Sequence, residues 1–364
     1  ASIVDDSSLA VTTATGLYVP QNYDHTFRGK VSLRTALGAS LNVPAVRTLA
    51  LVGYEPFYDK LRALGFETLT RRADHYGYSL ALGGAEVTLL ALANAYRTLA
   101  NDGRHSSVSV SPGQGGATST QVLDPRAAFV IGNILEDSGA RAATFGLASP
   151  LATRYPASVK TGTSTEMRDN WAIGYSTRHT VGVWVGNFSG EPMHDVSGVA
   201  GAAPVWREIM DFLHADEPPR GRGAPAGVVR QAVEYAGGIE PPREEWFLAG
   251  TESAQIVAVD AAPGRPRIVS PANGALLAID PDIPPGRQRV LVRIAGAQPG
   301  TRLVIGTTPH PAAEPLLWRP TPGRHLLRLV DEKGAEFDRV SVTVRGVSLP
   351  RTAYVQGARG PAAQ

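Results

Sequence analysis

The sequence predicts an α+β fold in which a helical cluster packs on an antiparallel sheet, followed by a small all-β sandwich domain. Segments with helix caps and periodic apolar residues occupy the first part of the chain. Short runs of β-branched and aromatic residues, bounded by turn residues, follow near the middle. From residue 267 onward, short alternating runs separated by Pro and Gly are typical of a sandwich.

The helices are predicted from their ends as well as from their apolar residues. Pro44 favours the start of one helix, and Gly65 follows the end of another. Asp124 and Pro125 form an N-cap and first-turn pair. The helices predicted before the sheet span residues 31–39, 44–51, 55–64, 86–99 and 127–136.

The sheet is predicted from three apolar runs, which lie around residue 160, at residues 171–175 and at residues 180–186. Each run is short and ends in turn residues, as buried strands do. A closing helix is expected at residues 204–214. Helices, then antiparallel strands, then a helix suit a helical cluster packed on one sheet.

The second half of the chain predicts a linker and a separate module. Residues 216–226 are charged and rich in Pro and Gly, and residues 228–235 predict a strand. Sandwich strands are expected at residues 288–295, 302–306, 323–330 and 338–344. In the third of these, Leu326, Arg328 and Val330 are expected to face solvent or a partner.

We therefore expect four parts. The first domain would span residues 1–215, and a linker and docking segment would span residues 216–266. The β-sandwich module would follow at residues 267–346, and residues 347–364, which hold few large apolar side chains, would form a disordered tail.

Composition excludes several functional classes. The chain of 364 residues is 43% hydrophobic with a net charge of +2, and its arginines are scattered, so no nucleic-acid partner is expected. It has no cysteine, and its eight histidines show no ligand spacing, so no metal site and no cofactor are expected. The most apolar long stretch, residues 80–99, contains Glu86, Asn94 and Arg97 and suits a buried helix better than a membrane span.

One motif points to chemistry. Lys160-Thr161-Gly162-Thr163 lies on a predicted edge strand, and a Lys-Thr-Gly beside a sheet is one of three elements of the serine acyl-transfer enzymes that penicillin attacks. The second element is Ser-x-Asn, and Ser40-Leu41-Asn42 lies upstream in the expected order. The third, Ser-x-x-Lys, carries the nucleophile and is absent. The residues three positions before the four lysines are Phe27, Phe57, Ala157 and Val330.

Longer segments extend the match. The chain resembles the C-terminal part of the bifunctional (class A) penicillin-binding proteins, and the 1C type in particular. The transpeptidase resemblance rests on residues 36–49, 82–103, 159–174 and 197–206. The resemblance to the C-terminal module of the 1C type rests on residues 243–252 and 268–289.

The resemblance implies a fold of the serine transpeptidase and β-lactamase type, incomplete at its N-terminus. It implies a peptidoglycan D,D-transpeptidase that transfers acyl groups from D-Ala-D-Ala stem peptides and is inhibited by β-lactams. A membrane anchor and a glycosyltransferase domain would lie upstream, at the periplasmic face of the inner membrane. The C-terminal module would meet the cell wall or a periplasmic protein.

In this family the Ser-x-x-Lys lies a few tens of residues before the Ser-x-Asn, so it would end just before Ala1. We interpret its absence as truncation in preference to a relative that naturally lacks a nucleophile. The chain alone is accordingly predicted to be inactive.

The resemblance also assigns roles to residues. Ser40 would relay a proton toward the leaving amine, and Asn42 would orient the substrate amide and the missing lysine. Lys160 would attract the substrate carboxylate and tune the Ser40 hydroxyl. The alternatives are that Ser40 caps the helix starting near Pro44, that Asn42 is a turn residue, and that Lys160 is a solvated charge blocking edge pairing.

The rest of the motif would bind substrate. The hydroxyls of Thr161 and Thr163 would hold the carboxylate, and the Thr163 N–H would be an oxyanion donor. Gly162, without a Cβ, would let the substrate backbone lie along the strand edge. Two other functions stay open: a carboxypeptidase or β-lactamase with water as acceptor, and a non-catalytic scaffold that binds stem peptides or the cell wall.

Overall fold

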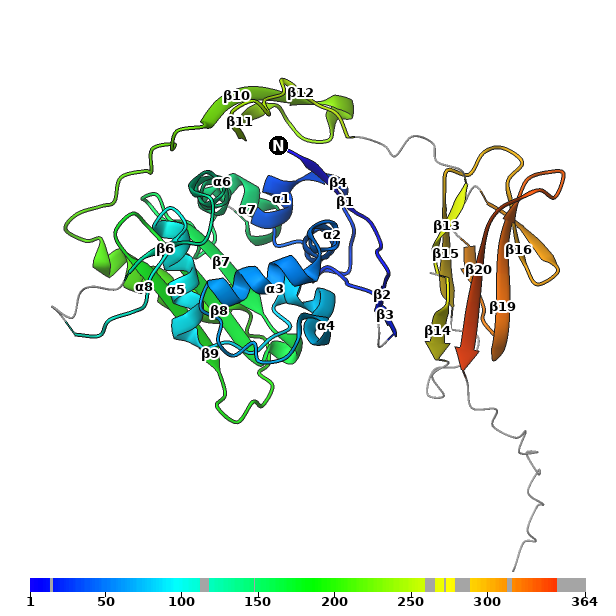
Figure 1. Ribbon diagram of the computed structural model, residues 1–364, viewed down its shortest axis with the longest axis horizontal. Coiled ribbons are helices and arrows are strands. Elements are labelled where there is room, and N and C mark those ends of the chain that lie inside the picture. The colour runs from blue at the N-terminus through cyan, green and yellow to red at the C-terminus, as the bar shows by residue number, and fades with distance from the viewer. Residues whose placement is uncertain are drawn as a thin grey trace, which may run out of the picture. The chain divides into compact units, whose positions relative to one another are not determined.

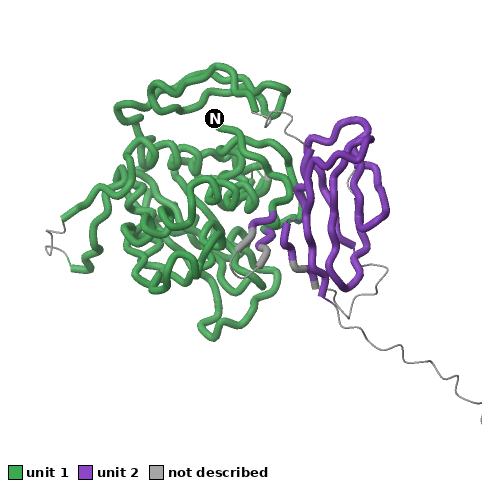
Figure 2. The backbone as a smooth tube through the Cα atoms, turned by 45° about the vertical axis from the view of Figure 1, so that its right-hand side comes forward, with its two compact units in different colours: residues 1–9, 20–258 green, residues 10–19, 259–364 purple. Residues whose placement is uncertain are grey.

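The computed structural model describes residues 1–13, 16–111, 118–146, 148–258, 266–271, 273–278, 289–312 and 316–345. The chain divides into two compact units, coloured separately in Figure 2. The first comprises residues 1–9 and 20–258, and the second comprises residues 10–19 together with the chain after residue 258. The predicted tail, residues 347–364, lies outside the described residues.

Helices and a central sheet build the first unit (Figure 1). Its longer helices are α1 (Leu33–Gly38), α2 (Asn42–Val52), α3 (Tyr54–Ala63), α5 (Leu89–Ala100), α6 (Pro125–Glu136), α7 (Ser138–Phe145) and α8 (Ala203–Leu213), and α4 (Ala73–Tyr76) is one turn. All five helices predicted before the sheet are confirmed, as is the closing one. The helix expected from residue 86 begins instead at Leu89, because the Thr88 hydroxyl caps it by accepting from the Ala91 N–H.

The central sheet is antiparallel, with strands β7 (Ser158–Thr163), β8 (Asp169–Tyr175) and β9 (Thr180–Gly186) in that order. β7 therefore lies at an edge. One face packs on α8, where Val159, Ala172 and Trp206 are buried together. The other face meets α5, because a Cβ at Gly182 would lie 3.0 Å from Leu89. The sheet is thus covered on both faces, and Lys160 lies on the α5 side.

A second sheet in this unit joins β10 (Val228–Tyr235), β11 (Arg243–Leu248) and β12 (Gln255–Ile256), with β10 in the middle. The strand predicted at residues 228–235 is confirmed. Residues 216–258 belong to the first unit, and residues 259–265 of the predicted docking segment lie outside the described residues. The unit also holds the pairs β1 (Ile3–Asp6) with β4 (Gly29–Ser32) and β5 (Arg104–His105) with β6 (Thr120–Gln121).

The second unit contains a β-sandwich. One sheet has the order β13-β15-β18 and the other β14-β20-β19-β16-β17. The strands are β13 (Arg267–Ser270), β14 (Ala275–Ala278), β15 (Val290–Ala295), β16 (Arg302–Ile305), β17 (Thr308–Pro311), β18 (Leu316–Trp318), β19 (Gly323–Val330) and β20 (Glu336–Arg345). Ile268 and Val292 from the first sheet share a core with Leu303, Leu327 and Val342 from the second. The hairpin of β2 (Val11–Thr13) and β3 (Gly16–Tyr18) belongs to this unit by its contacts.

The expectation for Val330 is wrong. The register of β19 against β20 shifts between Leu329 and Val330, and this irregularity turns Val330 inward, so that both side chains are buried. Leu326, two strand repeats earlier, is exposed as expected. None of the helices in the described residues has the length and apolar character needed to cross a membrane.

Candidate active site

Ser40 occupies the tight turn between α1 and α2. Its φ of 58° places it in the left-handed region, which a residue with a side chain seldom adopts. The turn is held by the Leu41 N–H, which donates to the Ala36 carbonyl over 2.9 Å, and by the Thr144 hydroxyl, which donates to the Ala39 carbonyl over 2.9 Å. The interpretation of Ser40 as a helix cap is wrong, because α2 begins after Leu41 and has no side-chain cap.

Lys160, on the edge strand β7, contacts this serine. Its Nζ donates to Ser40 Oγ over 2.5 Å and to the Thr161 carbonyl over 2.8 Å. Burial lowers the pKa of Lys160 to about 8. About a tenth of such amines are neutral at pH 7, so the group is poised to give or take a proton. The alternative of a solvated edge charge is therefore wrong.

Asn42 bonds to the segment that precedes β4. Its side-chain amide donates to the Gln21 carbonyl over 2.8 Å, and its backbone N–H donates to Asn22 Oδ1 over 2.9 Å. The segment before β4 thus fixes the first turn of α2. Neither Gln21 nor Asn22 carried a signal in the sequence, because both lie about twenty positions upstream in an irregular segment.

The rest of the motif divides between the two faces of β7. Side chains alternate along a strand, so Thr161 and Thr163 lie on the face opposite Lys160. Thr163 Oγ1 accepts a hydrogen bond from the Gly198 N–H at 2.9 Å, which leaves the hydroxyl proton free to donate elsewhere. A Cβ added at Gly162 would meet no atom closer than 3.8 Å, so packing alone does not require glycine there.

Three hydrogen bonds hold the turn that follows the motif. Ser164 Oγ donates to Asp169 Oδ2 over 2.9 Å and accepts from the Asp169 N–H at 2.8 Å. Trp184 on β9 donates from Nε1 to the other carboxylate oxygen of Asp169 over 2.9 Å. The sequence suggests only a polar turn here, since the bond from Trp184 depends on the sheet register. Together these bonds fix the end of β7.

The described residues contain no group of three or more His, Cys, Asp or Glu side chains placed to hold a metal ion. The arrangement of Ser40 and Lys160 instead offers a hydroxyl bonded to an ammonium group of lowered pKa. Such a pair holds or moves a proton at the serine oxygen and attracts an anionic group.

Two family models match the chain. The penicillin binding protein transpeptidase domain matches residues 4–211, which include Ser40 and Lys160. The Penicillin-Binding Protein C-terminus Family matches residues 257–342, over the sandwich.

Curated relatives agree with these models. The chain is 31% identical to penicillin-binding protein 1C of Escherichia coli K12 over 266 residues, covering 69% of this chain and 33% of the relative. It is 30% identical to penicillin-binding protein 1A of Neisseria lactamica over 236 residues, covering 60% of this chain and 29% of the relative. The chain thus spans about a third of the length of these relatives.

A solved structure shares the fold. Penicillin-binding protein 1A from Haemophilus influenzae superposes with a TM-score of 0.58 at 22% identity, covering 70% of this chain and 46% of that one. The predicted fold class is confirmed, as is the resemblance to the C-terminal part of a class A protein. The chain belongs to the penicillin-binding protein transpeptidase family and carries, after the transpeptidase domain, a module of the Penicillin-Binding Protein C-terminus Family.

Proposed function

We propose that the chain is the D,D-transpeptidase part of a bifunctional peptidoglycan synthase, which transfers acyl groups from D-Ala-D-Ala stem peptides through a serine acyl-enzyme. The observation that carries the proposal is the 2.5 Å contact between Lys160 Nζ and Ser40 Oγ, within the matched transpeptidase region. No Ser-x-x-Lys occurs in the sequence. The nucleophile is therefore proposed to lie in another part of the longer protein.

The contact supports a specific proton path. The nucleophilic serine gives its proton to the lysine of the upstream Ser-x-x-Lys and attacks the carbonyl carbon of the penultimate D-alanine, and the bond to the terminal D-alanine nitrogen breaks. Lys160 donates to Ser40 Oγ, which leaves the Ser40 O–H free to give its proton to the leaving nitrogen. Ser40 then takes a proton from the Lys160 ammonium, a step that the lowered pKa of Lys160 favours. An acceptor amine finally displaces the serine oxygen: the amine proton returns through Ser40 to Lys160, and the serine oxygen takes back its proton from the Ser-x-x-Lys lysine.

The substrate would lie along the edge of β7. Lys160 would attract its terminal carboxylate from one face of the strand, the hydroxyls of Thr161 and Thr163 would donate to it from the opposite face, and the Thr163 N–H would serve the oxyanion. Gly162 has no Cβ, which supports close approach of a peptide backbone to the strand edge. Asn42 would orient the substrate amide through its Oδ1 or its second amide N–H, since the bond to the Gln21 carbonyl uses one N–H.

The proposed setting follows from the relatives. The protein would act at the periplasmic face of the inner membrane, with an anchor and a glycosyltransferase domain upstream of this chain. Residues 216–266 would link and dock the C-terminal module, which would bind the cell wall or a periplasmic protein. A second candidate function is a non-catalytic scaffold that binds stem peptides, which the missing Ser-x-x-Lys favours.

A penicillin label separates the two candidates. Fluorescent penicillin followed by a denaturing gel should leave this chain unlabelled, whereas a longer protein that includes an upstream Ser-x-x-Lys should be labelled. A longer protein that stays unlabelled would favour the scaffold. A labelled band at the mass of this chain would overturn the proposal that the nucleophile lies elsewhere.

Binding of the carboxylate is tested on the chain itself. Calorimetry would compare a stem peptide ending in D-Ala-D-Ala with the same peptide carrying a C-terminal amide. The acid should bind more tightly than the amide, and Lys160→Ala should abolish the difference. Equal binding of acid and amide would contradict the proposed anchor.

A further inference from the structure

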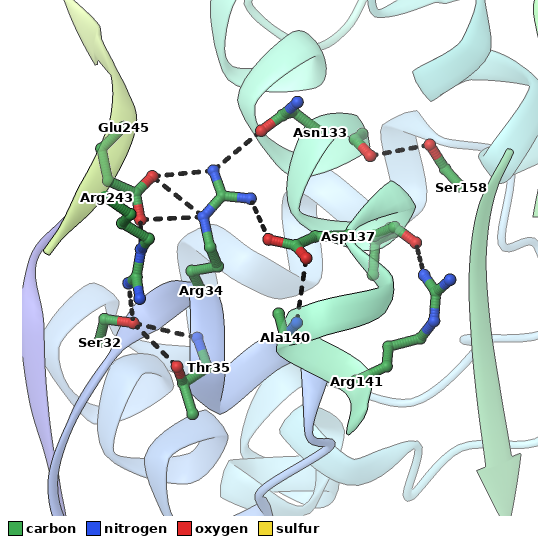
Figure 3. Close-up of polar contacts among 12 residues, drawn as sticks. Ser32, Arg34, Thr35, Asn133, Asp137, Ala140, Arg141, Ser158, Arg243 and Glu245 are labelled. Atoms are coloured by element: carbon green, nitrogen blue, oxygen red, sulfur yellow. Dashed lines mark hydrogen bonds and ion pairs between the residues drawn. The ribbon is translucent and has the colours of Figure 1, made fainter. Parts of the chain in front are cut away.

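Arg34 of α1 is the most heavily bonded buried side chain near the site (Figure 3). It is 5% exposed. Its Nε donates to both carboxylate oxygens of Glu245, over 2.9 and 3.0 Å, and its Nη2 donates to Glu245 Oε2 over 2.8 Å. Nη1 donates to Asp137 Oδ2 over 3.1 Å, and Nη2 also donates to Asn133 Oδ1 over 2.8 Å. Arg34 thus joins three elements at one point.

Glu245 comes from β11, which lies outside the matched transpeptidase region. Burial acts to raise the pKa of Glu245, but hydrogen bonds from Arg34 and Arg243 outweigh it and lower the pKa to about 2. Arg243 also donates to Ser32 Oγ over 2.8 Å, and Ser32 caps α1 by accepting from the Thr35 N–H. The β10–β12 sheet is therefore bonded to α1 at two places, through Glu245 to Arg34 and through Arg243 to the capping residue Ser32.

One arm runs from Arg34 to the turn that carries Ser40. Asp137 accepts from Arg34 with one carboxylate oxygen and, with the other, caps α7 by accepting from the Ala140 N–H at 3.0 Å. Two turns later on α7, the Thr144 hydroxyl donates to the carbonyl of the residue before Ser40. The orientation of α7, and hence of this turn, depends on Asp137.

A second arm runs from Arg34 to the strand that carries Lys160. Asn133 belongs to α6, and the carbonyl of its neighbour Gly132 accepts from Ser158 Oγ at 2.8 Å. Ser158 precedes Lys160 by two residues on β7, so both side chains lie on the same face of the strand. Figure 3 shows both arms leaving the guanidinium group.

We propose that Glu245 and Arg34 form a positioning hub for the Ser40–Lys160 contact, so that the β10–β12 sheet is a working part of the acyl-transfer site. The hub has one arm to each partner of that contact, and its anchor lies in the segment between the two matched regions. The consequence for acyl transfer rests on the proposed function. The coupling between Glu245 and Lys160 is a property of the fold and is tested without catalysis.

The test follows the titration of Lys160 by NMR. The chain has only four lysines, so labelling with ¹³C-lysine gives four side-chain Cε signals, and Lys160→Arg assigns one of them. Glu245→Gln should loosen both arms, admit water to the ammonium and raise the pKa of Lys160 by about one unit. Glu244→Gln is the matched control, because it changes a neighbour on the same strand whose side chain is 53% exposed and paired with an exposed Arg230.

Two milder variants keep the test decisive if Glu245→Gln fails to fold. Thr144→Val cuts the arm to Ser40, and Ser158→Ala cuts the arm to β7. Each should move the Lys160 titration in the same direction. If variants that fold have lower melting temperatures but leave that titration unchanged, the hub is only structural and the proposal is overturned. Failure of the stem peptide to bind would count against the proposed function and leave this coupling intact.

Discussion

Burial makes the charged form of Lys160 unfavourable in the folded chain. The unfolded chain binds this proton with a pKa of 10.5 and the folded chain with a pKa of about 8. Between these values the unfolded state holds more protons, so the free energy of unfolding rises with pH across this window. Below pH 8 the folded state bears the full cost, which is about 3 kcal/mol for a shift of this size. Such a cost is typical of functional sites.

Replacing this charge should therefore stabilise the fold. We expect Lys160→Met to raise the free energy of unfolding at pH 7 by about 1–2 kcal/mol, since the lost bonds to Ser40 and to the Thr161 carbonyl offset part of the gain. The advantage should vanish above about pH 11, where the lysine is neutral in the unfolded parent as well as in the folded one. Urea unfolding at both pH values measures it, with Lys60→Met as an exposed control. A Met variant that is less stable at pH 7 would contradict this reasoning.

The carboxylate of Glu245 should act in the opposite pH range. Its pKa falls from 4.5 to about 2 on folding, so its stabilising contribution is present above pH 4.5 and is lost as the pH falls to 2. Its side chain is 2% exposed, and the contribution is about 3 kcal/mol. Glu245→Gln should flatten the loss of stability between pH 4.5 and 2, as measured by urea unfolding with tryptophan fluorescence. The same slope in parent and variant would show that other carboxylates dominate.

The sequence predicted Ser40 and Lys160 as site residues, but not the buried residues that hold them in place. Ser40 and Lys160 stand in motifs whose spacing carries chemistry. Arg34 and Glu245 are 211 positions apart, and only the folded chain brings them together. Arg34 is the single charged residue of α1, but Glu245 follows two other charged residues on β11, so neither position identifies the other as its partner.

At the scale of elements, two glycines make a matched comparison. A Cβ at Gly38 on α1 would lie 2.7 Å from the Ala140 Cβ and 3.0 Å from its carbonyl carbon, so α1 and α7 would have to separate. Gly38→Ala should cost about 1–3 kcal/mol, although alanine normally favours a helix. Gly162→Ala meets nothing closer than 3.8 Å and should change stability by less than about 0.5 kcal/mol.

The second variant should instead affect binding. A methyl group at Gly162 would stand on the proposed substrate edge of β7 and weaken the stem peptide while the melting temperature stays that of the parent. Thermal unfolding and calorimetry of both variants check the pair. If Gly38→Ala is as stable as the parent, α1 and α7 can move apart at this contact without loss of stability. If Gly162→Ala binds the peptide as the parent does, the substrate lies elsewhere.

Elements with strong local signals were predicted well. Asp124 and Pro125 marked the start of α6, and three β-branched runs marked the central sheet. Helix α7 was not predicted from the sequence. It has no clear sequence signal, because its Ser-Gly-Ala-Arg-Ala stretch has no apolar period and its start depends on the Asp137 cap. Strand β17 was not predicted either. It is an edge strand that contains Pro309 and Pro311, where proline is tolerated because one side of the strand needs no ladder bonds.

At the scale of the whole molecule, the two matched regions leave residues 212–256 between them. The proposed boundaries treat this stretch as a linker and docking segment. Its β10 and β11 strands contribute Glu245 to the first unit, so truncation after residue 215 should expose Arg34 and remove its main partner. Sequence composition identified the Pro- and Gly-rich stretch but gave no measure of how firmly the following strands are held.

The sandwich should fold by itself. Among the described residues, its buried core consists of side chains between 268 and 344, from both sheets. We expect residues 267–346, expressed alone, to give a cooperative thermal transition with β-type circular dichroism. Leu327→Ala, at a fully buried position, should lower the stability by about 2–5 kcal/mol. Leu326→Ala, the exposed neighbour, should have little effect. A non-cooperative melt of the isolated segment would mean that residues 10–19, which contact this unit, are needed to complete it.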